Sequence, residues 1–173
     1  MKRRPEISEP IVDLVRRHRV ATSLLVPGFV DLHASPQVVT PFPRVLFLGG
    51  DHDYLSLSID EISGQFSIGE TANPSVPNSL LDEPTIQPIF VDLSIYHLSE
   101  VHPIEFESAS LYLDQDSSEV RNLFRAIAFN YGDGRVLLFD PFWPFGIRVG
   151  NEADAVRLRD EMGQMGRAMA IDL

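Results

Sequence analysis

The sequence predicts an α+β fold: a single domain in which an antiparallel β-meander sheet is packed by several α-helices. Periodicity is the first observation, because apolar and polar residues alternate over 54–59 and 65–68, after the short apolar run 45–48. The second observation is that turn-forming residues, Gly49-Gly50-Asp51 and Ser63-Gly64, separate these three runs. The third is order, since strand and helix patterns do not alternate regularly along the chain, which favours α+β over α/β.

The N-terminal half contributes one helix, a mostly extended segment and a loop around this meander. Ser8-Glu9-Pro10 is typical of a helix start, and the apolar spacing that follows predicts a short basic helix over 9–18. Residues 21–44 are predicted to be mostly extended, with a turn at Pro27-Gly28. Residues 70–88 contain four prolines and are predicted to form a long loop.

Downstream of this loop, residues 89–91 predict a short buried strand, followed by a helix from Asp92 to about His102. The segment 104–113 is compatible with a strand or with irregular structure. A full amphipathic stripe then predicts a helix over 118–131, with apolar residues at helical spacing.

The C-terminal part is predicted to form two strands, 135–140 and 147–149, before a last helix that Asn151 caps. This helix would carry a narrow apolar stripe made of Ala155, Leu158, Met162, Met165 and Met169.

Composition excludes several classes of protein. The chain has 173 residues with 44% hydrophobic content, enough for one core, and it has no apolar run of the roughly 18 residues that a membrane helix needs. The absence of cysteine excludes disulfides and thiolate chemistry, and the N-terminus lacks the apolar region of a secretory signal. Lys2 is the only lysine, which leaves no candidate for a P-loop or a Schiff base. These features fit a cytoplasmic protein.

The charge is negative and unevenly distributed. The formal net charge is -11, and between Arg44 and Arg121 there are fourteen Asp and Glu residues but no Lys or Arg. Such a field repels nucleic acid and anionic membranes and attracts a basic protein. A solvated acidic surface kept for solubility would give the same composition.

No metal or cofactor site is predicted. His97 and His102 are five residues apart, about 140° around a helix, so they cannot easily share a metal. Asp114 and Asp116 open like a calcium loop, but Glu119 stands where that loop requires glycine, and helix capping explains the two acids.

Two clusters leave a functional alternative open. Asp51-His52-Asp53 could perform acid–base chemistry, although a turn after Gly49-Gly50 is the simpler explanation. The aromatic turn Phe142–Phe145 could be a binding anchor or a plug over the core at a strand end.

Part of the chain resembles the SUKH superfamily of bacterial immunity proteins. The resemblance covers residues 44–102 and is carried by Gly50-Asp51, the strand 54–59, the loop from Asp60 to Gly64, the strand 65–68 and the strand-to-helix segment 90–98. It implies an α+β protein-binding module that neutralises a toxin, often a nuclease or a nucleic-acid deaminase, and such toxins are commonly basic.

We therefore expect a non-enzymatic module that binds a basic protein through an acidic surface. The candidate contacts are Asp51, Asp53, Asp60, Glu61, Asp82, Glu83, Glu105 and Glu107. One alternative is a hydrolase centred on Asp51, His52 and Asp53. Another is an acidic chaperone or adaptor that dimerises through its methionine-bearing C-terminal helix.

Overall fold

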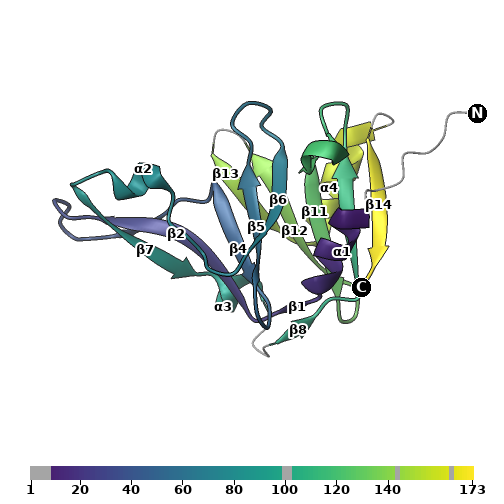
Figure 1. The fold of residues 1–173 in the computed structure, drawn as a ribbon, viewed down its shortest axis with the longest axis horizontal. Coiled ribbons are helices and arrows are strands. Elements are labelled where there is room, and N and C mark those ends of the chain that lie inside the picture. The colour runs from purple at the N-terminus through teal and green to yellow at the C-terminus, as the bar shows by residue number, and fades with distance from the viewer. Residues whose placement is uncertain (1–8, 99–102, 143–144, 164–165) are drawn as a thin grey trace, which may run out of the picture.

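The computed structural model describes residues 9–98, 103–142, 145–163 and 166–173. The fold is mostly β, with 47% strand and 20% helix, and its strands form three antiparallel sheets. Only two described helices reach seven residues, so the predicted packing by several helices is wrong. The core lies instead between two sheets (Figure 1).

The predicted meander is confirmed and forms the middle of a seven-stranded sheet. Its strands are β4 (Val45–Gly49), β5 (Tyr54–Ile59) and β6 (Phe66–Thr71). In β5, Leu55, Leu57 and Ile59 are buried while the serines between them are partly exposed, as the alternation requires. The short strand β10 (Leu123–Phe124) pairs with β6, and β2 (Ser23–Asp31) pairs with β4 at the other side.

The strand β2 continues beyond the meander, and this end of the sheet forms a projecting arm (Figure 1). Its outer half pairs with β3 (Val39–Pro41) on one side and with β7 (Ile86–Asp92) on the other. We define the arm as residues 26–42 and 76–92, which include the four-residue helix α2 (Asn78–Leu81). The predicted loop over 70–88 thus contains the end of β6, α2 and the start of β7.

The turn predicted at Pro27-Gly28 is wrong, because both residues lie inside β2. The carbonyl of Pro27 accepts a hydrogen bond from the backbone N–H of Phe42, so the strand continues although proline donates none. Gly28 is required by close approach, since a Cβ there would lie 2.8 Å from the carbonyl oxygen of Thr40.

The second large sheet has the order β13-β12-β11-β9-β14. In chain order its strands are β9 (Ser108–Leu113), β11 (Ala126–Tyr131), β12 (Arg135–Phe142), β13 (Gly146–Gly150) and β14 (Arg167–Asp172). The strands predicted near 135–140 and 147–149 are confirmed and extend further, and the undecided segment 104–113 contains β9.

The helix predicted over 118–131 is wrong. The structure has a single 3₁₀ turn, η1 (Glu119–Arg121), then β10 and β11. The two faces of β11 are both covered: Ile127, Phe129 and Tyr131 join the main core, while Ala126 and Ala128 pack under the last helix. A strand buried on both faces loses its polar alternation, and the remaining apolar run imitated a helical stripe.

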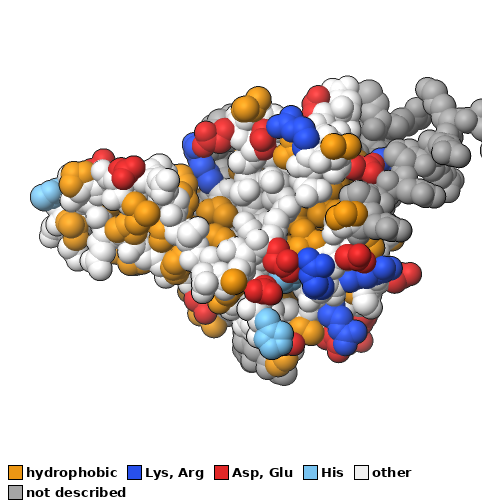
Figure 2. Space-filling view, in the orientation of Figure 1, with side chains coloured by type: hydrophobic (Ala, Val, Ile, Leu, Met, Phe, Trp, Pro, Cys, Tyr) orange, Lys and Arg blue, Asp and Glu red, His pale blue; other side chains and the backbone are white. Residues whose placement is uncertain are grey.

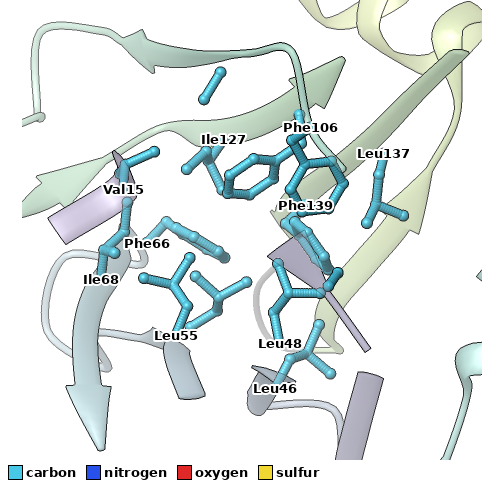
Figure 3. Close-up of a cluster of buried hydrophobic side chains, with 14 of the residues drawn as sticks. Val15, Leu46, Leu48, Leu55, Phe66, Ile68, Phe106, Ile127, Leu137 and Phe139 are labelled. Carbon is cyan, nitrogen blue, oxygen red and sulfur yellow. The ribbon is translucent and has the colours of Figure 1, made fainter. Parts of the chain in front are cut away.

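The core fills the space between the two sheets (Figure 3). Leu46, Leu48, Leu55, Phe66 and Ile68 of the meander sheet meet the aromatic and aliphatic side chains of the second sheet. Those facing side chains include Phe106, Ile127, Leu137 and Phe139. Phe106 and Phe129 stack with their ring centroids 4.6 Å apart. This sandwich is a β-sheet core, and α4 covers the outer face of its second sheet.

Two helices pack against this sandwich, near the two ends of the chain, as the sequence predicts. The helix α1 (Glu9–Arg17) buries Ile11, Leu14 and Val15 in the main core. The helix α4 (Glu152–Met162) begins with the predicted Asn151 cap, a capping box with Asp154.

The predicted stripe of the last helix is confirmed for Ala155, Leu158 and Met162, which pack together. Its extension to Met169 is wrong, because α4 is capped by Gly163 (φ 55°) and Met169 lies in β14. Met165 lies outside the described residues. The chaperone hypothesis, which placed dimerisation on this helix, stays a prediction.

The helix predicted from Asp92 is shorter than expected. The structure forms only α3 (Ser94–His97), with Leu98 already extended, and residues 99–102 lie outside the described part. A two-stranded ribbon joins β1 (Val20–Ala21) to β8 (Ile104–Glu105). None of the helices in the described ranges is both long and apolar enough to cross a membrane.

Candidate protein-binding surface

The eight candidate acids lie in separate places. Asp51 and Asp53 lie in the turn before β5, whereas Asp60 and Glu61 lie in the turn after it. Six residues of strand separate these turns by about 20 Å. Asp82 and Glu83 lie on the arm, and Glu105 and Glu107 lie near the β1–β8 ribbon. The eight acids therefore do not form one continuous surface and lie instead in at least three separate groups.

Three of the eight acids are paired with arginines from distant parts of the chain. Glu61 lies 3.1 Å from Arg44, Glu105 lies 3.2 Å from Arg19, and Asp60 lies 3.6 Å from Arg121. Hydrogen bonds from Ser63 lower the pKa of Asp60, as does Arg121 nearby. The sequence between Arg44 and Arg121 contains no cation, but folding places arginines from outside this segment beside its acids. The negative charges of these three acids are therefore partly neutralised.

Asp51 and Asp53 line an open pocket of about 400 Å³ at the end of α1. Its other walls include His18, Glu70 and His52, together with the arginines at positions 16, 17 and 19. The predicted acid–base cluster therefore lies next to a second histidine. Spacing along the chain gives no signal for that neighbour.

His18 and Glu70 form a pair at the floor of this pocket. His18 is 3% exposed, and its Nε2 lies 3.0 Å from Oε1 of Glu70. Burial lowers the pKa of His18, although the hydrogen bond and charge of Glu70 oppose that shift. Arg17 donates to both oxygens of Glu70, at 3.2 and 3.0 Å, and this lowers the pKa of Glu70. The arrangement is a neutral imidazole held against an arginine-bound carboxylate.

The arm carries acids and no cation, since residues 26–42 and 76–92 contain no Lys or Arg. Asp31, Asp82, Glu83 and Asp92 are exposed there, so their charges are not balanced within the arm. Figure 2 shows hydrophobic side chains gathered over the arm, with acidic groups at its rim. Exposed apolar side chains on the arm are Leu32, Val38, Val39, Leu81 and Phe90.

A buried ion cluster lies at the end of β12. Asp140 is 1% exposed and is held by both Arg125 and Arg148. Beside it, the rings of Phe142 and Phe145 stack at 5.4 Å and are 55% and 73% exposed. These two aromatics therefore do not plug the core; Trp143 and Pro144 between them lie outside the described residues.

The motifs weighed as metal sites give no cluster in the described part of the chain, where no three His, Asp or Glu side chains are placed to hold an ion. His102 lies outside the described residues. Asp114 and Asp116 form a local turn instead, in which Asp114 accepts from the N–H of Asp116 and from the hydroxyl of Ser117.

Comparison with known proteins assigns no relative: the chain matches no family model, no curated protein and no solved structure.

Proposed function

We propose that the protein is a binding module for a basic protein. The observation that carries the proposal is the uneven balance of charge. Arginines pair with several acids on the body, among them Asp60, Glu61 and Asp140, whereas the arm carries four exposed acids and no Lys or Arg. An exposed acidic surface of this kind attracts and orients a cationic partner, and that attraction weakens as salt rises.

The more specific form of the proposal is immunity against a toxin. It is supported by the resemblance of residues 44–102 to SUKH immunity proteins, whose targets are often nucleases or nucleic-acid deaminases. Enzymes of that kind are commonly basic, because they bind phosphate backbones. An acidic module docked over such an active site would exclude the nucleic acid.

The test is capture of the partner from native lysate with the tagged protein at low and high salt, followed by identification. We expect one basic protein, retained at low salt and lost at high salt. If that protein is a toxin, a stoichiometric amount of the module should inhibit its nuclease or deaminase activity. An acidic partner, or retention that salt does not change, would contradict the proposal.

A second candidate, a hydrolase, is favoured by the pocket around His18. A buried histidine that contacts a carboxylate, beside Asp51 and Asp53, is a suitable arrangement for a general base. Screening with ester and phosphoester substrates tests it. The hydrolase alternative requires an activity that is lost in Asp53→Asn or His18→Gln while the fold is retained.

A further inference from the structure

We propose that one face of the arm binds an amphipathic basic helix of the partner, with Phe29 and Phe90 at the centre of the contact. This inference rests on the proposed function and assigns it a place and a binding mode. Three features carry it: the edges of the arm, the composition of the face and the position of its acids.

Both edges of the arm disfavour strand addition. Leu93, just after β7, donates to the carbonyl of Leu24, and Leu32, just after β2, donates to that of Thr85. Since antiparallel ladders alternate, the odd-numbered residues between them bond to β2 and the even-numbered ones point outward. Pro88 is therefore an outward position without an N–H group.

The opposite edge of the arm, formed by β3, also has a proline at an outward position. Phe42 donates to the carbonyl of Pro27, so Thr40 also faces β2 and Pro41 points outward. Each free edge thus has one outward position without a donor, Pro88 within β7 and Pro41 at the end of β3, which disfavours pairing with an added strand. A face of the arm is therefore the better site for a partner.

The face that includes Phe90 is apolar at its centre. Directly opposite residues share a face, so Phe90 lies with Pro27, and Phe29 lies with Pro88. Phe90 is 39% exposed and its ring packs edge-on against Phe47, with centroids 6.2 Å apart. A half-exposed aromatic supported by a buried one is a suitable anchor for a partner's apolar stripe.

The acids of this face lie at its two ends. Asp31 is opposite Ile86 near the tip, and Asp92 is opposite Leu25 near the body. By strand geometry they are about 20 Å apart, which corresponds to about 13 residues of helix. The other face has no acid at the paired positions, where Val26, Gly28, Val30, Gln87, Ile89 and Val91 lie. The acids therefore favour the Phe90 face as the binding surface. They fit a helix that carries cations at both ends of its apolar stripe.

The experiment uses the whole protein and two synthetic probes of about 18 residues with the same Leu and Lys content. One has helical spacing of leucine, and the other alternates leucine and lysine as a strand does. Affinity is measured by titration for the wild type, Phe90→Ser and Asp31→Asn with Asp92→Asn. The matched control is Asp160→Asn with Glu161→Gln, which removes two exposed charges from α4. Circular dichroism checks that each variant is folded.

We expect the helical probe to bind the wild type and the α4 control equally. Phe90→Ser and the double arm variant should each bind it about tenfold more weakly or worse. Equal binding by all variants would overturn the assignment to the arm, as would failure of the wild type to bind the helical probe. Tighter binding of the strand probe would overturn the helix. The proposed function is tested separately by the capture experiment. If a basic protein is captured in a salt-sensitive manner, the proposed function stands even when the peptide results overturn the arm or the helix.

Discussion

The arm and the body of this protein use charge in opposite ways. On the body, several acids are paired with arginines, most completely Asp140, which is buried between two of them. On the arm, acids are exposed beside apolar side chains and no cation is present. This difference in charge is what the proposed role of the arm in recognition requires, because exposed pairs on the body contribute little beyond stability and an unpaired acidic surface is open to a partner.

The largest expected effect separates the two regions by stability. Phe139→Ala should cost about 3–5 kcal/mol, because the ring is fully buried between the sheets. Phe90→Ala on the arm should cost only about 1–2 kcal/mol, since its ring is already partly in water. Urea unfolding of both variants measures the contrast, and equal costs would mean that the arm is part of the core.

The next effect concerns the buried ion cluster. Asp140→Ala leaves two arginines without their shared partner and should cost about 2–3 kcal/mol, somewhat less than a fully buried pair because both arginines reach solvent. Glu61→Gln, which removes an exposed pair, should change the free energy of unfolding by less than about 1 kcal/mol. A small loss in Asp140→Ala would show that the cluster contributes little to stability.

A third prediction addresses binding. The double substitution Asp82→Lys with Glu83→Lys should weaken binding of the captured basic protein about tenfold, or about 1.4 kcal/mol. It should also reduce the dependence of this affinity on salt. Asp160→Lys with Glu161→Lys on α4 makes the same change in net charge and should have a clearly smaller effect. Equal weakening by both pairs would mean that net charge alone drives association.

The smallest effect is a dependence on pH confined to the body. The pKa of His18 is lower in the folded protein, so the unfolded chain binds more protons as pH falls below about 6.5, and stability declines. The lowered pKa of Glu70 adds a further decline below about pH 4.5. His18→Gln should flatten the loss of thermal stability between pH 7 and 5. If His18→Gln lost thermal stability with falling pH as the wild type does, the assignment of this pH dependence to His18 would be contradicted.

Elements with local signals were predictable, and elements defined by their neighbours were not. The meander could be predicted because each strand has one buried and one exposed face. The strand β11 was not, because α4 covers the face that would otherwise be polar. The strand β14 was missed because the methionines around it continue the spacing of α4.

The same limit applies to the candidate site. The sequence shows which residues are acidic, but the partners that neutralise Asp60 and Glu105 come from residues 121 and 19. The contact between His18 and Glu70 joins residues 52 positions apart and has no counterpart in any spacing rule. The absence of cations on the arm was visible in the sequence, yet only the pairing of β2 with β3 and β7 makes it one surface.

The most direct test is hydrogen–deuterium exchange of the protein with and without its basic partner. We predict that protection rises in residues 25–31 and 86–92, while α4 and the turn between β5 and β6 remain unchanged. Protection confined to the body, with the arm exchanging as in the free protein, would contradict the claim that the arm is the recognition surface.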